Sequence, residues 1–194
     1  EMSHRVKNLL ALAAGLTNIT SRSAETKEEM AKQLTQRLTA LGRAHELVRP
    51  LPNGQGNAAL LGDLFSVILA PYDDVGAFAG RIRVAVPRMG IGEKAATSLA
   101  LVVHELATNS LKYGALSNDA GLLDISGRVN DDEVEIVWTE SGANRTSTPV
   151  SAEGYGSRLL QRTISGQLAG SIDYNWIEGG VVVTLRMREA HLTV

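Results

Sequence analysis

The segment spanning residues 93–113 constrains the fold of this chain most strongly. It contains neither glycine nor proline, and its apolar residues recur in steps of three and four until Gly114. That spacing predicts one long α-helix, and a glycine directly after the last periodic residue is a common helix end. We expect this helix to be one of several that cover one face of a β-sheet.

The expected strands cluster late in the chain and pair by hairpins. Five segments read as strands: residues 81–86, 122–129, 133–138, 171–176 and 181–187. Turn residues at 130–132 and 178–180 join the last four strands into two hairpins. Further helices are expected at residues 60–69, ending at Pro71, and at 157–168. This pattern indicates an α+β sandwich with helices on one face of the sheet.

The N-terminal region predicts two amphipathic helices, at residues 4–19 and 27–48, joined by a short polar turn. Such a helical hairpin either packs on the rest of the chain or self-associates into a four-helix bundle. Prolines and glycines at residues 50–57 indicate a linker. We therefore expect a hairpin domain at residues 1–53 and a second domain at 54–194.

Composition excludes several classes of function. The net charge is −2, which does not favour nucleic-acid binding, and the absence of cysteine excludes disulfides and thiolate metal sites. No run of about 18 apolar residues suggests a membrane span, and the N-terminus lacks a signal-peptide pattern. We expect a cytoplasmic fragment of a longer protein.

Residues 104–114 carry the most informative polar side chains. On a helix, Glu105, Asn109 and Lys112 project from one side. A carboxylate, an amide oxygen and an ammonium suit a site for magnesium and phosphate, although a solvated face near a helix end is the alternative. A zinc-protease motif is improbable, because Thr108 stands where H-E-x-x-H requires a second histidine.

Two glycine-rich stretches could approach phosphates closely. Gly142 follows an expected strand, while Gly154, Gly156 and Ser157 precede an expected helix. Plain turns are the alternative for both. The dinucleotide-binding fingerprint fails, because Leu159 occupies its third glycine position, and no P-loop sequence occurs.

His4 lies on the first expected helix. A neutral imidazole nitrogen can attack a phosphoryl group, and an unperturbed histidine has a pKa near ~6.5. A purely structural histidine is the alternative.

Taken in order, these features resemble the sensor histidine kinases, and in particular the HWE family. The resemblance rests on His104, on Trp138-Thr139-Glu140, and on the stretch His4-Arg5-Val6-Lys7-Asn8-Leu9-Leu10. It implies a Bergerat-type (GHKL) ATP-binding domain in residues 54–194. It also implies that residues 1–53 form a dimerisation and histidine phosphotransfer domain.

The resemblance further implies roles for individual residues. Asn109 would bind Mg²⁺, and Glu105 would act as a general base or as a water-mediated partner of Mg²⁺. Lys112 would meet a phosphate, and Tyr113 would line the adenine side. The other positions implied to bind ATP are Glu140, Gly142, Gly154, Gly156, Ser157 and Thr184.

The implied activity is autophosphorylation of His4 with Mg-ATP, followed by transfer to an aspartate of a response regulator. Implied partners are a second copy through the hairpin and a sensor domain N-terminal to this fragment. One departure from most histidine kinases is Arg5, which stands where an acid usually follows the phosphoacceptor. The alternatives are an ATPase or a serine/threonine protein kinase on the same fold, or a degenerate scaffold.

Overall fold

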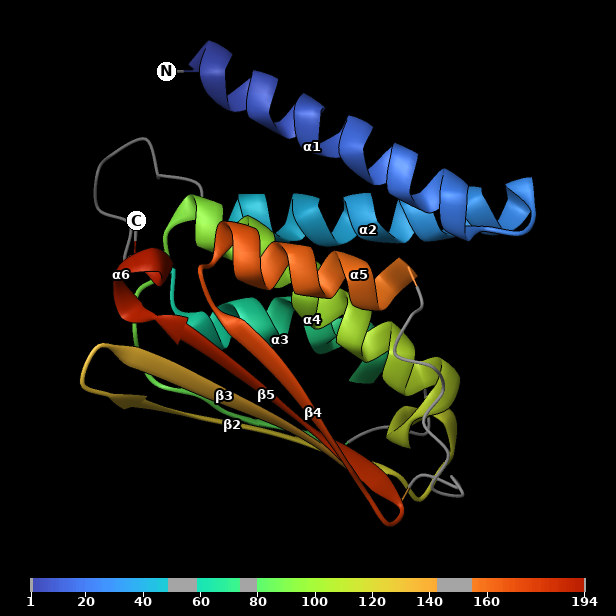
Figure 1. Ribbon diagram of the computed structural model, residues 1–194, viewed down its shortest axis with the longest axis vertical. Helices are drawn as coiled ribbons and strands as arrows, with labels where there is room; N and C mark the ends of the chain where they lie inside the picture. The colour runs from blue at the N-terminus through green and yellow to red at the C-terminus, as the bar shows by residue number, and fades with distance from the viewer. Residues whose placement is uncertain (1, 49–58, 74–79, 143–154, 194) are drawn as a thin grey trace.

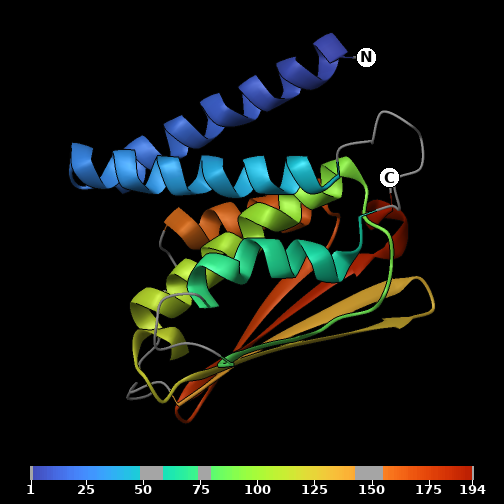
Figure 2. The same ribbon diagram turned by 180° about the vertical axis from the view of Figure 1, so that it is seen from behind.

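Three layers make up the structure, a computed structural model that describes residues 2–48, 59–73, 80–142 and 155–193 (Figures 1 and 2). The sheet forms one outer layer, helices α3, α4 and α5 cover one of its faces, and α1 and α2 lie on those helices. The helices are α1 (Met2–Ser23), α2 (Lys27–Leu47), α3 (Leu61–Asp73), α4 (Glu93–Tyr113), α5 (Tyr155–Arg162) and α6 (Glu189–Leu192). The strands are β1 (Ile82–Ala85), β2 (Leu122–Asn130), β3 (Glu133–Ser141), β4 (Ser171–Ile177) and β5 (Gly180–Arg188).

The sheet confirms the predicted α+β class. Its strand order is β1-β2-β3-β5-β4, with β1 parallel to β2 and the other pairs antiparallel. The two predicted hairpins are present, and Asp131 (φ 53°) and Gly179 (φ 70°) adopt the left-handed conformation at their turns. Both hairpins thus place late segments of the chain side by side beneath the helices.

One face of the sheet is apolar and the other is charged. Alternate residues of β5 are buried against the helices: Val181, Val183, Leu185 and Met187. On the opposite face, which no helix covers in Figures 1 and 2, ion pairs cross the strands. They join Arg128 to Glu135, Glu135 to Arg186, and Arg186 to Asp173.

Helix α4 is the centre of the core, as its periodicity predicts. Its residues from Ala95 to Ala107 are almost all buried, and it packs against both α2 and α3. Exposure rises only in the last turns, where Lys112 and Tyr113 reach the surface. The helix therefore carries its polar residues from the core to one end of the molecule.

The N-terminal hairpin packs on the rest of the chain. Ala40 and Ala44 of α2 belong to the main core. A second apolar cluster joins α1, α2, α4 and α5 through Leu16, Leu41, Leu101 and Leu159. The hairpin thus packs on the rest of the chain, and its self-association into a four-helix bundle stays a prediction. The expected boundary at residue 53 lies outside the described residues.

Some element limits differ from the sequence-based expectation. Helix α3 continues past Pro71 to Asp73, and the Tyr72 hydroxyl in this extra turn contacts His104. Proline forfeits one helical hydrogen bond, a loss that a tertiary contact at the helix end offsets. Helix α5 ends at Arg162 and continues as a π-turn over Thr163–Gln167, and neither the short helix Ala115–Ser117 nor α6 was expected.

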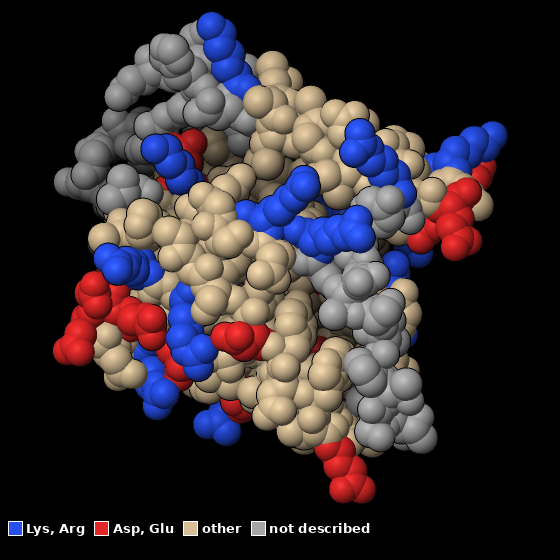
Figure 3. All heavy atoms as spheres, in the orientation of Figure 1, with Lys and Arg blue, Asp and Glu red and all other residues tan. Residues whose placement is uncertain are grey.

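Surface features agree with the composition. Basic and acidic side chains are interspersed over the face shown in Figure 3, and neither sign covers it. None of the described helices is long and apolar enough to cross a membrane.

Candidate active site

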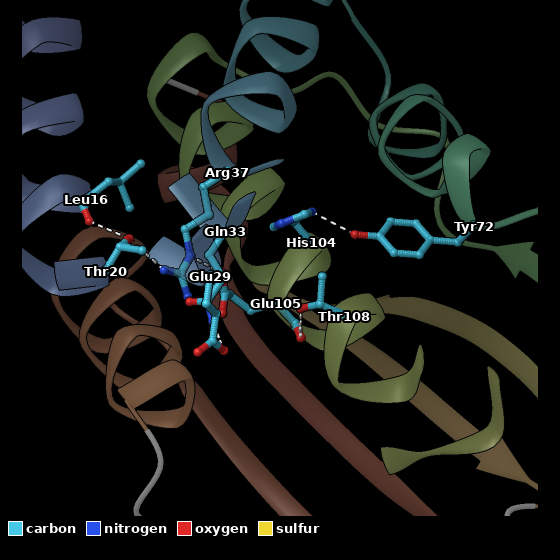
Figure 4. Close-up of polar contacts among 9 residues, drawn as sticks. All are labelled: Leu16, Thr20, Glu29, Gln33, Arg37, Tyr72, His104, Glu105 and Thr108. Carbon is cyan, nitrogen blue, oxygen red and sulfur yellow. Dashed lines mark hydrogen bonds and ion pairs between the residues drawn. The ribbon is translucent and has the colours of Figure 1, made fainter. Parts of the chain in front are cut away.

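Glu105, the carboxylate predicted to act near the phosphates, is buried and paired with Arg37 of α2 (Figure 4). The Arg37 Nε atom donates to Oε1 at 2.6 Å and Nη2 donates to Oε2 at 2.9 Å. Both side chains are almost inaccessible to water: Glu105 is 4% exposed and Arg37 is 6% exposed. A two-pronged pair of this kind fixes both oxygens of the carboxylate.

Arg37 also contacts the first helix. Its Nη1 atom donates to Thr20 Oγ1 at 2.7 Å, and Thr20 Oγ1 donates to the Leu16 carbonyl oxygen at 2.6 Å. Every nitrogen of the guanidinium therefore has an acceptor, which a buried arginine requires. The chain of contacts links α1, α2 and α4.

The next turn of α4 presents groups that are open to a ligand. Asn109 is half-buried, and its side chain makes no hydrogen bond with the residues that the structure describes. Lys112 and Tyr113 follow it and are exposed. Asn109 thus has an amide oxygen, one turn from Glu105, that accepts no hydrogen bond from the described part of the chain.

The donor set fits a magnesium ion bound together with phosphates. No group of three or more histidine, aspartate and glutamate side chains that could hold a metal occurs among the described residues. Mg²⁺ commonly takes only one or two protein oxygens and completes its shell with waters and phosphates, so Asn109 fits this role. Glu105 fits only if the packing around it opens, because its carboxylate is paired with Arg37 and is only 4% exposed.

Gly156, in the first turn of α5, lies directly against Glu105. A Cβ atom at this position would stand 3.3 Å from Glu105 Oε2. The glycine therefore lets α5 approach the carboxylate closely, while its predicted place beside phosphates stays a prediction. Gly154 and the side chains of Ser157 and His4 lie outside the described residues.

Glu140 is buried at the end of β3 and acts as a hydrogen-bond acceptor for two neighbours. Trp138 Nε1 donates to its Oε1 at 2.9 Å, and the Ala115 backbone N–H donates to its Oε2 at 2.7 Å. A Cβ on Gly114 would stand only 1.8 Å from Oε2. The carboxylate thus holds the segment after α4 against the sheet, and an additional contact with adenine stays a prediction.

Gly142 follows β3 with φ 74°, and a Cβ there would stand 2.8 Å from the Ala120 carbonyl oxygen. Gly180 was not predicted as a site residue, although a Cβ there would stand 1.9 Å from the Glu140 carbonyl oxygen. The double glycine at 179–180 was the available signal. Gly180 thus packs against the backbone of Glu140, and Gly142 packs against the backbone of Ala120.

The structure does not bring Thr184 together with the other predicted residues. Buried side chains alternate along β5, and Thr184 stands between two of them, on the face opposite the helices. Val181 is the β5 residue beside Glu140 in the register, and it faces the core. Strand alternation therefore separates Thr184 from α4.

His104 precedes Glu105 and bonds to α3. The Tyr72 hydroxyl lies 2.8 Å from His104 Nδ1. Burial lowers the pKa of His104, with the charge of Glu105 opposing the shift, and burial raises the pKa of Tyr72. Both shifts favour the neutral forms, so an uncharged hydroxyl and an uncharged imidazole share one hydrogen bond, whose donor depends on the imidazole tautomer.

Sequence reasoning missed Arg37, Thr20 and Tyr72. Arg37 carried a signal, because it stands three residues after Leu34 and four before Leu41, on the apolar stripe of α2. A charged residue on a buried stripe requires a partner.

Comparison with known proteins gives a consistent result. A family model described as HWE histidine kinase matches residues 1–87. A blue-light-activated histidine kinase 1 of Erythrobacter litoralis (strain HTCC2594) is 34% identical over 183 residues, which cover 93% of this chain and 50% of that protein. A blue-light-activated histidine kinase of Brucella anthropi is 32% identical over 187 residues, covering 94% of this chain and 37% of that protein. The chain thus spans half or less of the length of these relatives.

Solved structures share the fold. The histidine kinase domain of the Erythrobacter litoralis EL346 blue-light-activated kinase superposes with a TM-score of 0.63 at 16% identity, covering 95% of this chain and 98% of that one. The histidine kinase ThkA in complex with the response regulator TrrA gives a TM-score of 0.52 at 15% identity, covering 98% of this chain and 60% of that one.

Proposed function

Because this chain belongs to the HWE histidine kinases, we propose that it binds Mg-ATP at the C-terminal end of α4 and phosphorylates His4. The observation that carries the proposal is the arrangement around that end. Glu105 and Asn109 stand one turn apart on α4, and Gly156 of α5 lies against the carboxylate. Together they offer oxygen ligands and an approach for phosphates.

Each residue then has a distinct task. Bound Mg-ATP supplies the phosphoryl group and a cation that offsets phosphate charge. Asn109 offers its amide oxygen to the metal, and Lys112 offers its ammonium to a phosphate. Glu105 would orient a water beside the metal or accept the proton of the attacking imidazole, while Glu140 would hold the wall on the adenine side.

Positioning accounts for most of the catalysis in phosphoryl transfer, so His4 must come into line with the γ-phosphorus. In Figures 1 and 2 the first turn of α1, which contains His4, lies at the opposite end of the molecule from the last turn of α4. The reaction therefore requires the hairpin to leave its docked position, or a second copy of the chain to supply the histidine.

The proposed acceptor of the phosphoryl group is an aspartate on a response regulator, the kind of partner bound to ThkA in its solved complex. We assign dimerisation to the hairpin. Leu10 of α1 is 65% exposed, which leaves an apolar side chain available to a second copy.

Autophosphorylation with γ-labelled ATP and Mg²⁺ tests the function. An acid-labile label in the wild type that disappears in His4→Ala is expected, with ATP binding retained in the variant. Asn109→Ala should lose the label because the metal loses its protein ligand. An acid-stable label would instead identify a serine or threonine kinase, and ATP hydrolysis with no label would identify an ATPase.

A further inference from the structure

The pair between Arg37 and Glu105 joins the N-terminal hairpin to the proposed nucleotide-binding part of the chain, and these two parts must separate if His4 is phosphorylated within one chain. Arg37 belongs to the hairpin that includes His4, and Glu105 belongs to the helix that carries Asn109. Figure 4 shows the guanidinium against the carboxylate, with Thr20 of α1 to its left. The contact therefore connects the hairpin to the helix whose C-terminal end is proposed to bind the nucleotide.

The pair engages both oxygens of the carboxylate, and the side chain is buried. Both oxygens accept from the guanidinium at 2.6 and 2.9 Å. Each oxygen keeps a second lone pair, but Glu105 is only 4% exposed, so a cation or a metal-bound water reaches the carboxylate only when the elements packed around it move apart. The buried charge of Glu105 also needs a positive or hydrogen-bonding partner in every state.

The same docked arrangement holds the start of α1 far from the end of α4 (Figures 1 and 2). The small apolar cluster of Leu16, Leu41, Leu101 and Leu159 supports the docking. The docked position of the hairpin therefore has two consequences: Glu105 is paired with Arg37, and the turn that contains His4 lies far from the end of α4.

We propose that Arg37 competes with the magnesium-nucleotide for Glu105, so that hairpin docking and nucleotide binding oppose each other. In the docked state Arg37 neutralises the carboxylate and the kinase is silent. When the nucleotide engages Glu105, the arginine loses its partner and the hairpin is released. This inference rests on the proposed function, because it assigns the nucleotide to the same end of α4.

Linkage makes the competition reciprocal. If docking weakens nucleotide binding by a given factor, the nucleotide weakens docking by the same factor, commonly about 5- to 150-fold between coupled sites. A variant without the guanidinium should therefore bind nucleotide more tightly and have an undocked hairpin even without nucleotide.

The absence of cysteine allows a direct measurement of docking. Spin labels on cysteines at Thr39 of α2 and Ser126 of β2, both exposed, report the distance between the hairpin and the sheet by pulsed electron resonance. The wild type should give one narrow distance that a saturating, non-hydrolysable Mg-ATP analogue broadens. Arg37→Gln should give the broad distribution without nucleotide and should lower the Kd of the analogue on the order of 10-fold.

Lys32→Gln is the matched control, because it removes an exposed charge from the same helix. It should leave both the distance and the Kd unchanged. If Arg37→Gln fails to fold, the wild-type titration alone decides the matter, and Thr20→Val, which removes one of the arginine's contacts, should shift both readouts in the same direction by less.

A distance distribution that stays narrow at saturating nucleotide, with a Kd unchanged in Arg37→Gln, would overturn the competition. That result is separate from the phosphorylation assay. If His4 is labelled but nucleotide binding does not affect docking, the chain is a histidine kinase and the competition at Glu105 is wrong. If nucleotide binding opens the hairpin but His4 is never labelled, the competition is supported and the proposed reaction at His4 is wrong.

Discussion

Trp138 donates its indole N–H to Glu140, two residues further along the same buried face of β3, at 2.9 Å. Alternation along the strand puts both side chains toward the helices, so the W-x-E spacing places a donor next to a buried carboxylate. The second oxygen accepts from the Ala115 backbone N–H. Trp138 and Glu140 therefore hold the segment after α4 against the sheet.

Trp138→Phe should destabilise the protein, because it leaves Glu140 Oε1 buried without its donor and shrinks a fully buried ring system. The lost hydrogen bond alone should cost about 1–3 kcal/mol in the free energy of unfolding, measured by urea titration. Trp176→Phe, at a position that is 41% exposed, is the control and should change stability by less than about 0.5 kcal/mol. Equal losses in both variants would contradict the assigned role of Trp138.

A double-mutant cycle at Arg37 and Glu105 should show strong coupling. Arg37→Met leaves a buried carboxylate unpaired, which should cost about 3–5 kcal/mol as unfolding or as loss of hairpin docking. Adding Glu105→Met removes that charge and should recover most of the loss. Guanidinium chloride unfolding of the four proteins measures the coupling, and simple additivity would show that the pair contributes no interaction energy.

Much of the fold follows from periodicity. Residues 93–113 form α4 with the limits that their apolar spacing indicates, and both late hairpins occupy their expected positions. The sequence did not predict the extra turn of α3 after Pro71. This turn contains Tyr72, whose hydroxyl contacts His104 on another helix. Local propensity contains no information about that contact.

The candidate site was only partly predictable. The sequence placed Glu105 and Asn109 on one helix, but Arg37 lies 68 residues from Glu105, and spacing within a helix does not reveal which other helix it meets. Thr184 is different, since the alternating apolar residues of β5 already indicate that it faces away from the helices. Comparing the alternation of β5 with the position of α4 would therefore have separated Thr184 from the other predicted site residues.

The buried histidine should make stability depend on pH. Burial lowers the pKa of His104 in the folded state below its ordinary value of 6.5, so the unfolded chain binds this proton more readily. The contribution to stability is complete above about pH 6.5 and is lost as the pH falls through that value toward the lower folded pKa. His104→Gln should flatten this part of the curve between pH 7.5 and 5, in unfolding titrations at each pH. A curve parallel to that of the wild type would show that another group titrates.

The ion pairs on the uncovered sheet face should make a small contribution that depends on salt. The Glu135 side chain is 13% exposed and lies between Arg128 at 2.6 Å and Arg186 at 3.1 Å, whose side chains are 66% and 40% exposed. Glu135→Gln should therefore lower the free energy of unfolding by no more than about 1 kcal/mol at low salt. In about 1 M NaCl, where the screening length is about 3 Å, the difference from the wild type should shrink. A loss that salt does not reduce would mean that Glu135 acts through packing of its side chain, since a charge interaction at an exposed surface is screened.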